Sequence, residues 1–297
     1  MDCPIVSVIV CTYNRSDILP ICLQSLINQE IDKTLFEVII INNNSADNTQ
    51  KIAEQYAKKY CNFRVFIEQE LGLSNARNRG WKEARGEYIA YIDDDAKADS
   101  KWILEIVNFI HKYPNVMVFG GPYYGFSLKP LPKWFPPNYG TKVLSKRIRK
   151  LKKGKEYLSG SNMVFHRDIF KEFGGFKSSL GMSGNTIGYG EEPELQDRLF
   201  KKNIPIYYYP SLRIEHLIAE YKTKLIWQLK SYYAHGKSLQ MRMDKNYYNY
   251  ISLYNSFVSM FINMVFLPAM PFKRRLLYSI YPFVTQLGKL EYYLKHK

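Results

Sequence analysis

Short apolar runs alternate with amphipathic patterns over the first 120 residues of the chain. Apolar residues at helical spacing predict helices over 18–27 and 102–110, and Ser16 and Ser100 are the expected caps. Strands that alternate with helices indicate βαβ units and a mainly parallel sheet. The expected strands are residues 5–11, 36–41, 63–67, 88–92 and 116–119.

Polar residues follow three of these strands. Right-handed crossovers bring the carboxyl ends of parallel strands to one edge of the sheet, and ligands bind beyond that edge. The sequence therefore predicts a binding site there. Its residues are Thr12 to Arg15, Asn42 to Asn44 and Asp93 to Asp95.

The pattern changes after residue 120. Residues 121–156 lose periodicity and are rich in proline, aromatic and basic residues, and 142–155 holds eight Lys or Arg and no acid. A long segment of this kind is typical of a functional loop. The ordered part that follows has expected strands at 157–165 and 204–209, a glycine-spaced stretch at 181–190, a helix at 192–202 and further helices after His216.

Composition narrows the class of protein. The chain has 297 residues, 46% hydrophobic and 23% charged, which is typical of a globular protein. Its net charge of 42 − 27 = +15 favours anionic partners: nucleic acid, phosphorylated substrates or an acidic membrane surface. The four cysteines (Cys3, Cys11, Cys22 and Cys61) form no CxxC pair, and no secretory signal opens the sequence, so we expect a cytoplasmic protein.

Three adjacent carboxylates, Asp93, Asp94 and Asp95, follow the fourth expected strand. They would repel one another unless a cation neutralised them, so a divalent metal is one explanation. The alternative is a solvated acidic turn that caps the next helix. The position at the end of a parallel strand favours the metal.

The order of the motifs resembles that of family 2 glycosyltransferases with the GT-A fold, over roughly residues 5–240. The motifs are VSVIVCTYNR, INNNSADNT, GLSNARNRG, YIDDDA, LSGSNMVF, GYGEEPELQDRL and IEH. The resemblance implies a GT-A nucleotide-diphospho-sugar transferase fold, with a mainly parallel central sheet and helices on both faces. Together with the changes of pattern along the chain, it predicts a catalytic domain of residues 1–240, divided into 1–122, 123–156 and 157–240. The helical pattern of the last part predicts a helical extension of residues 241–297.

The resemblance makes the acidic triplet a DxD motif. It implies that Asp95 and Asp93 bind Mn²⁺ or Mg²⁺, and that Asp93 also reaches the nucleotide. Asp94 would contact the nucleotide or support the metal site. In IEH, His216 would be a further metal or phosphate ligand.

The general base is expected in the acidic pair of GYGEEPELQDRL. The reaction needs a carboxylate that removes a proton from the acceptor hydroxyl. Glu192 aligns with the usual second acid, but this chain has Glu-Glu where many relatives have Glu-Asp, so Glu191 stays an alternative.

The resemblance also assigns the donor and acceptor contacts. Asn43 stands where family members often have an acid that pairs with uracil, so UDP is only the preferred nucleotide. Arg77 is expected to contact the phosphates or the nucleotide base, and the alternative is an arginine on the surface of a helix. Asn162 and the glycines around Ile187 would border the acceptor, and Trp134 would stack on it or anchor the proline-rich segment. The turn expected to line the nucleotide consists of Thr12, Tyr13, Asn14 and Arg15.

These assignments describe an inverting, metal-dependent glycosyltransferase that moves a sugar from a nucleotide sugar to a hydroxyl of a saccharide acceptor. Processive synthases of the family carry membrane helices and a QxxRW motif, and neither is found in this sequence, so a single addition is favoured. The alternatives are a nucleotidyltransferase, which would need a glycine-rich phosphate loop after the first strand, and a basic nucleic-acid-binding protein.

The last part of the chain suggests a membrane surface. Residues 246–272 carry no charge, but polar residues and prolines interrupt them, so no transmembrane helix is expected. A helix over 251–266 would have serines on one side and a wide apolar face, followed by Lys273, Arg274 and Arg275. This pattern suits peripheral binding to the inner, anionic face of the membrane and a lipid-linked acceptor. The alternatives are that the helices cover the core or form a homodimer.

Overall fold

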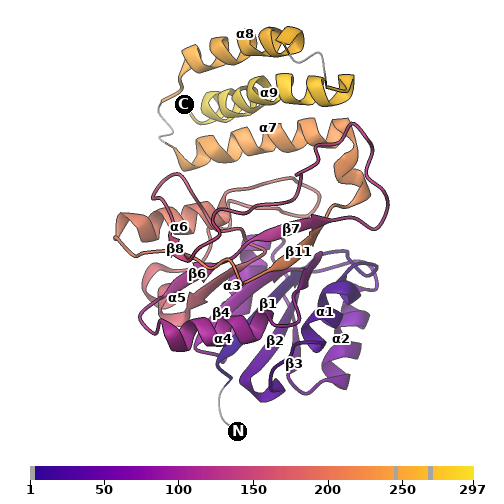
Figure 1. Cartoon of the computed structure of the whole chain (residues 1–297), viewed down its shortest axis with the longest axis vertical. Coiled ribbons are helices and arrows are strands. Elements are labelled where there is room, and N and C mark those ends of the chain that lie inside the picture. Colours follow the sequence, from indigo (N-terminus) through magenta and orange to yellow (C-terminus); the bar gives the residue numbers. More distant parts are fainter. Residues whose placement is uncertain (1–3, 244–246, 267–269) are drawn as a thin grey trace. The chain divides into compact units, whose positions relative to one another are not determined.

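The computed structural model describes residues 4–243, 247–266 and 270–297 (Figure 1). Cys3 and the residues at 246 and 267–269 of the uncharged stretch lie outside this part of the chain. The described chain forms two compact units. Unit 1 consists of residues 1–126, 140–179 and 191–217, and unit 2 of residues 127–139, 180–190 and 218–297.

Unit 1 is built on an eight-stranded sheet with the order β3-β2-β1-β4-β9-β6-β10-β8. The first four strands are parallel, β9 runs antiparallel to both of its neighbours, and β6 and β10 are parallel again. The mainly parallel sheet expected from the sequence is confirmed. The strands are β1 (Val6–Thr12), β2 (Phe36–Asn42), β3 (Phe63–Ile67), β4 (Tyr88–Asp93), β6 (Val118–Gly120), β8 (Arg149–Lys150), β9 (Met163–His166) and β10 (Tyr207–Tyr208).

A second sheet of three strands lies in the same unit. Its order is β5 (Ala96–Ala98), β11 (Ile214–Leu217) and β7 (Tyr123–Phe126), with β11 antiparallel to β5 and parallel to β7. Strands β5, β7 and β11 were not predicted from the sequence, because three or four residues are too few for a period to appear.

Helices cover both faces of the large sheet, because its strands are apolar on both sides. One buried cluster packs β-strand residues such as Val8 against α1, α2 and α4, and the other packs residues such as Ile9 against α3, α5 and α6. The helices are α1 (Leu19–Ile27), α2 (Thr49–Lys59), α3 (Leu73–Glu83), α4 (Trp102–Lys112), α5 (Arg167–Phe173) and α6 (Glu191–Lys201), with a short 3₁₀ helix η1 (Lys33–Leu35).

Both expected helix caps are wrong. Helix α1 begins after Ile18 and α4 after Lys101, and neither cap residue forms a side-chain capping bond. The backbone N–H of Ser16 donates to Asp47, and the hydroxyl of Ser100 donates to Glu30. In both cases the serine bonds to a residue far away in the sequence, Asp47 or Glu30, and does not cap the helix.

Two expected strands of unit 1 are shorter than predicted. The strand expected over 157–165 is confined to β9, and the one expected over 204–209 to β10. The preceding residues 157–162 are held by side chains instead: the backbone N–H of Leu158 donates to Gln196 Oε1 over 2.7 Å.

Unit 2 contains the helices expected after His216. They are η2 (Glu220–Thr223), α7 (Leu225–Arg242), α8 (Tyr250–Phe266) and α9 (Phe272–His296), and α9 lies between α7 and α8 (Figure 1). Within the described residues, no helix has both the length and the apolar character needed to cross a bilayer.

Helix α8 presents its apolar face outward. Ser256 is 7% exposed and its hydroxyl donates to the Leu253 carbonyl. Several large apolar side chains of α8 are between 43% and 69% exposed, whereas Leu253, Val258, Met260 and Met264 are half-buried. The exposed ones are Tyr250, Ile251, Tyr254, Phe257, Phe261, Ile262 and Val265.

Candidate active site

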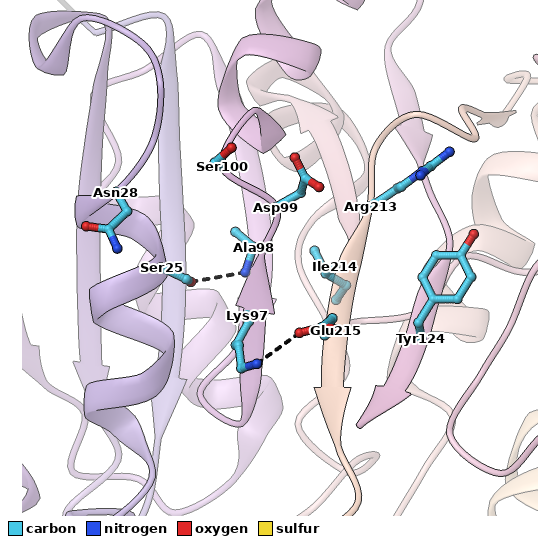
Figure 2. Close-up of a pocket in the computed structure, with 10 residues that line it drawn as sticks. All are labelled: Ser25, Asn28, Lys97, Ala98, Asp99, Ser100, Tyr124, Arg213, Ile214 and Glu215. Carbon is cyan, nitrogen blue, oxygen red and sulfur yellow. Dashed lines mark hydrogen bonds and ion pairs between the residues drawn. The ribbon is translucent and has the colours of Figure 1, made fainter. Parts of the chain in front are cut away.

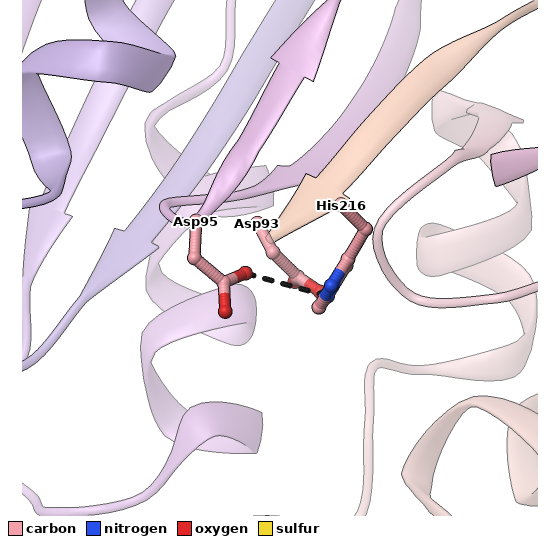
Figure 3. Close-up of side chains that lie close together, drawn as sticks. All are labelled: Asp93, Asp95 and His216. Carbon is pink, nitrogen blue, oxygen red and sulfur yellow. Dashed lines mark ion pairs between the residues drawn. The ribbon is translucent and has the colours of Figure 1, made fainter. Parts of the chain in front are cut away.

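Asp93, Asp95 and His216 form a compact cluster of ligand atoms in unit 1 (Figure 3). His216 Nε2 lies 3.3 Å from Asp95 Oδ1 and 3.5 Å from Asp93 Oδ2, and one ligand atom of each residue lies within 4.8 Å of the others. Two carboxylates and an imidazole suit Mn²⁺, and the carboxylates also suit Mg²⁺. The residues therefore fit the divalent ion that the sequence implied.

Strand pairing explains why these three residues meet. Asp93 ends β4, and β5 starts shortly after it. In the register of β11 on β5, His216 lies opposite Ala96, and the backbone N–H of Leu217 donates to the Asp95 carbonyl over 2.8 Å. The ring of Tyr123 packs beside the imidazole, with the ring centres 5.8 Å apart.

Asp94 is buried between the other two acids. Burial and the charge of Asp95 raise its pKa to about 7, although Arg15 and Thr12 act in the opposite direction. Its carboxylate is therefore costly to ionise without a cation nearby.

The turn after β1 is fixed by the turn after β2. The backbone N–H of Asn14 donates to Ser45 Oγ, and that of Arg15 donates to Thr49 Oγ1, both over 2.9 Å. Asn14 has φ = 51°, a left-handed conformation that asparagine tolerates better than most residues. The 12–15 turn thus has a defined shape at the predicted edge of the sheet, with Thr12 buried and Tyr13 half-buried.

Asn43, expected to contact the nucleotide base, also holds a neighbouring loop. Its Nδ2 donates to the carbonyls of Glu68 and Glu70 over 3.1 and 2.7 Å, and its Oδ1 accepts from Gly72 N over 2.7 Å. Both N–H donors of the amide are thereby used. Only the remaining lone pair of Oδ1 is left to accept a hydrogen bond from a nucleotide base.

Arg77 lies at the centre of the acidic residues rather than on the surface. Its side chain is 2% exposed, and its Nη1 lies 2.9 Å from Glu191 Oε1 and 3.3 Å from Glu192 Oε1. Its Nη2 lies 3.4 Å from Asp93 Oδ1. Burial lowers the pKa of this guanidinium, but the three carboxylates outweigh burial and raise it, so Arg77 stays charged.

The two glutamates at the start of α6 differ in exposure. The Glu191 side chain is 4% exposed and that of Glu192 is 19% exposed. Burial and the charge of Glu192 raise the pKa of Glu191 to about 8, against the opposing effect of Arg77. Among the residues that the structure describes, Glu191 Oε2 has no hydrogen-bond partner.

Asn162, expected at the acceptor side, is fully buried instead. Its Oδ1 accepts from Trp102 Nε1 over 3.0 Å, and its Nδ2 donates to the carbonyls of Pro122 and Leu212 over 2.8 and 2.7 Å. The amide uses both N–H donors and one acceptor position to join three segments of unit 1. Its position corrects the expectation, because an acceptor cannot reach a side chain with no exposed surface.

Trp134 belongs to unit 2 and is half-buried. Its carbonyl and those of Lys133 and Phe135 accept hydrogen bonds of 2.7–2.8 Å from the guanidinium of Arg274. The proline-rich segment is thus anchored by Arg274, one of the basic residues predicted from the sequence to face a membrane.

Two residues near the acids were not identified from the sequence. Gly160 lies so close that a Cβ there would be 2.1 Å from Glu192 Oε1 and 2.2 Å from Arg77 Nη2. Lys142 pairs by its backbone with Tyr123, and its half-buried ammonium acts electrostatically on Glu192. Lys142 opens the basic run of residues 142–155, but no pattern in the sequence distinguished it from the other Lys and Arg of that run.

A cavity of about 540 Å³ opens on the small sheet, away from these acids (Figure 2). Glu215 lines it, and since successive strand residues point to opposite faces, His216 points to the other side. Within the cavity Lys97 Nζ pairs with Glu215 Oε2 over 2.9 Å. None of the site residues predicted from the sequence lines it.

Comparison with known families assigns the chain. The profile described as Glycosyl transferase family 2 matches residues 7–174, more than half of the sequence. The chain belongs to this family. The family and the enzyme class expected from the motifs are confirmed, and the match favours them over a nucleotidyltransferase or a nucleic-acid-binding protein.

Relatives of this family 2 chain include the glucosyl-dolichyl phosphate glucuronosyltransferase of Haloferax volcanii. The two are 24% identical over 256 residues, which covers 82% of this chain and 78% of that enzyme. The chain spans only 12–33% of the length of seven other curated relatives it matches. One of them is the minor teichoic acid biosynthesis protein GgaB of Bacillus subtilis, which is 36% identical over 110 residues, 37% of this chain and 12% of that protein.

Solved structures show the same fold. The mannosyltransferase PcManGT from Pyrobaculum calidifontis, in complex with GDP-Man and Mn²⁺, has a TM-score of 0.59 at 15% identity, covering 98% of this chain and 75% of that chain. TarS 1–349 of S. aureus, in complex with UDP-GlcNAc, has a TM-score of 0.57 at 18% identity, covering 98% and 92%. The expected GT-A fold is confirmed.

Proposed function

We propose that this family 2 protein is a metal-dependent, inverting glycosyltransferase that moves a sugar from a nucleoside diphosphate sugar to a hydroxyl of a saccharide acceptor. The observation that carries the proposal is that Arg77 joins the metal-ligand cluster to the acidic pair: its guanidinium contacts Asp93 on one side and Glu191 and Glu192 on the other. An inverting displacement needs a leaving-group site and a base at opposite ends of one reaction centre.

Asp93, Asp95 and His216 would hold Mn²⁺ or Mg²⁺. The ion would supply charge neutralisation for the departing diphosphate. The 12–15 turn would bind the nucleotide, and Arg15, whose charge acts on Asp94, offers a cation at the same edge. Burial and the charge of Asp95 raise the pKa of Asp94 despite Arg15, which fits a site that also binds a metal ion.

Glu192 is our choice of general base. It is the more exposed of the two glutamates, and an acceptor hydroxyl must reach the base within hydrogen-bond distance. Glu191 is almost fully buried, so an acceptor hydroxyl cannot come within hydrogen-bond distance of it as it can for Glu192. Glu191 instead supports Arg77.

UDP stays the preferred donor nucleotide, and a lipid-linked saccharide the preferred acceptor. The related structures are complexes with UDP-GlcNAc and GDP-Man, so nucleotide sugars with either base occur on this fold. The H. volcanii relative is named for a dolichyl phosphate substrate, which supports a lipid-linked acceptor here.

A nucleotide-sugar panel tests the function. We expect UDP-sugars, and to a smaller extent GDP- or dTDP-sugars, to raise the melting temperature only with Mn²⁺ or Mg²⁺, because a ligand that binds only the folded state stabilises it. The best donor should then be transferred to a short saccharide acceptor with inversion at the anomeric carbon, followed by NMR. Thermal shifts that are equal with and without metal, or a retained anomeric configuration, would contradict the proposal.

We also propose that helix α8 binds the surface of an anionic membrane from the cytoplasmic side. Its exposed apolar face is wide enough to enter the headgroup region, and four of its exposed side chains, Tyr250, Tyr254, Phe257 and Phe261, are aromatic. Lys273, in the next helix α9, is exposed, and the whole chain carries a charge of +15; both favour anionic lipid. Arg274 contributes less, because it binds backbone carbonyls.

Liposome co-sedimentation tests the membrane proposal. The intact protein should pellet with vesicles that contain phosphatidylglycerol, and salt should weaken this binding. Replacing Ile251, Tyr254 and Val265 by serine should abolish it, whereas the control replacements Ile226→Ser and Leu128→Ser, at exposed apolar positions outside α8, should not. If the triple variant instead converts a dimer to a monomer and no form binds vesicles, the face is an interface between two copies.

A further inference from the structure

One arginine serves three carboxylates in the proposed reaction centre. Arg77 on α3 reaches Glu191 and Glu192 at the start of α6 and Asp93 at the end of β4, over N–O distances of 2.9 to 3.4 Å. A guanidinium has five donors in a fixed planar fork, so it can bridge groups that a lysine could only contact one at a time.

The surroundings of Arg77 allow it little movement. Its side chain is 2% exposed and stacks near the Phe176 ring, 5.5 Å from the ring centre. Its own backbone carbonyl accepts a hydrogen bond from the Tyr91 hydroxyl over 3.2 Å. Because Arg77 is held in place, the carboxylates that it contacts are held in place as well.

Gly160 lies directly beside the ends of the Arg77 and Glu192 side chains. A Cβ at this residue would be 2.1 Å from Glu192 Oε1 and 2.2 Å from Arg77 Nη2, far below any normal contact. Gly160 therefore lets the backbone pass directly beside the Arg77–Glu192 ion pair. Any other residue type at this position would have to displace the end of one or both of these side chains.

We propose that Arg77 is a positioning residue that fixes Glu192 relative to the metal ligand Asp93, and that Gly160 is required for this contact. The inference rests on the proposed function, in which Glu192 is the base. Glu191 has the role of a buried support: its carboxyl makes the shortest of the three contacts with Arg77, 2.9 Å, and is itself too enclosed to meet an acceptor. This role differs from the phosphate or base contact that the sequence suggested for Arg77.

The two roles predict opposite kinetic results. A positioning residue acts on the transfer step, so its replacement lowers kcat and leaves nucleotide affinity unchanged. A phosphate contact acts on the donor, so its replacement weakens nucleotide binding directly. A misplacement of about 1 Å at a reacting group can cost roughly 10²-fold in rate.

The experiment compares Arg77→Lys and Gly160→Ala with the wild type. For each protein, the dissociation constant and stoichiometry of UDP binding with saturating Mn²⁺ are measured by calorimetry, and kcat and the acceptor KM are measured by transfer. Arg79→Lys is the matched control, because Arg79 lies on the same helix but pairs with Glu83 at the surface.

We expect both site variants to lose roughly 10²-fold in kcat, with UDP affinity and acceptor KM within about threefold of the wild type and a binding stoichiometry near one. The unchanged stoichiometry shows that the loss does not come from unfolded protein. Arg79→Lys should match the wild type. Because Gly160→Ala keeps the arginine, it tests the contact even if Arg77→Lys does not fold.

Two results would overturn the inference alone: unchanged kcat in Gly160→Ala, or a loss of UDP affinity in the two site variants that accounts for the loss in rate. A wild-type protein that neither binds a nucleotide nor transfers a sugar would overturn the proposed function itself, and the inference with it.

Discussion

The imidazole Nε2 of His216 lies 3.3 Å from Asp95 Oδ1, because β11 pairs with β5 in a register that places His216 opposite Ala96. The neighbouring residue Glu215 points to the other face of the same sheet and pairs with Lys97. Two consecutive residues of one strand thus have different partners. His216 faces the DxD carboxylates, and Glu215 forms a solvent-exposed ion pair with Lys97.

This alternation gives a matched pair of variants for the metal site. We expect His216→Ala and Asp95→Asn to weaken Mn²⁺ binding at least tenfold in the presence of UDP, about 1.4 kcal/mol, because each removes a ligand atom. Electron paramagnetic resonance titration of free Mn²⁺ measures this directly. Glu215→Gln should bind Mn²⁺ as the wild type does, and equal effects of Glu215→Gln and His216→Ala would refute the assignment.

The acidic pair of α6 gives the second prediction. Glu192→Gln should keep UDP binding and lose transfer by roughly 10²–10⁴-fold, the usual range for a general base. Glu191→Gln should be milder, since the amide oxygen can still accept a hydrogen bond from Arg77. Steady-state transfer at saturating donor measures both, and a larger loss in Glu191→Gln would assign the base to Glu191.

The large sheet was predictable because its strands are buried on both faces. Phe36–Asn42 is buried at every position, so the run of apolar residues is visible without any alternation. The small sheet was not, because β5, β7 and β11 have three or four residues each and are held by long-range pairing. The caps failed for the same reason, since Asp47 and Glu30 recruit Ser16 and Ser100 from a distance.

The sequence predicted which residues could bind a metal, but it did not predict how the site residues contact one another. The resemblance named Asp93, Asp95 and His216 together, and the structure brings them within 4.8 Å of one another. It did not reveal that Arg77 is shared among the acids, since an arginine's partners depend on how helices pack. Gly160 was also hidden, because a glycine required for close approach looks the same in sequence as one in a loop.

Asn162 gives a prediction about stability. Asn162→Ala leaves Trp102 Nε1 and the carbonyls of Pro122 and Leu212 without their partner, so we expect the free energy of unfolding to fall by roughly 2–4 kcal/mol. Urea denaturation measures the change, and Asn108→Ala, at an exposed position of α4, is the control. A variant with unchanged stability but a raised acceptor KM would restore the acceptor role that the sequence suggested.

The buried acids give a prediction about pH. The pKa of Glu191 is raised to about 8 and that of Asp94 to about 7, so between about pH 5 and 8 the folded state holds protons that the unfolded state has lost. Stability therefore falls as pH rises through this range, by about 1.4 kcal/mol per pH unit for each group that is protonated only in the folded state. Below about pH 4 the sign reverses, because the pKa of Asp47 and Glu156 is lowered to about 2 and their stabilising contribution is lost on protonation.

Glu191→Gln isolates the larger of the two contributions. An uncharged amide has no proton to lose, so the variant should show a smaller decline in the free energy of unfolding from pH 5 to pH 8 than the wild type. Urea denaturation of the metal-free protein at pH 5, 6.5 and 8 measures the slope, with Glu172→Gln, an exposed glutamate in α5, as the control. Equal slopes for wild type and Glu191→Gln would mean that Glu191 is already ionised at pH 5, with Arg77 outweighing the cost of burial. In that case Glu191 could accept a proton, and only its burial, with 4% of the side chain exposed, would argue against its being the general base.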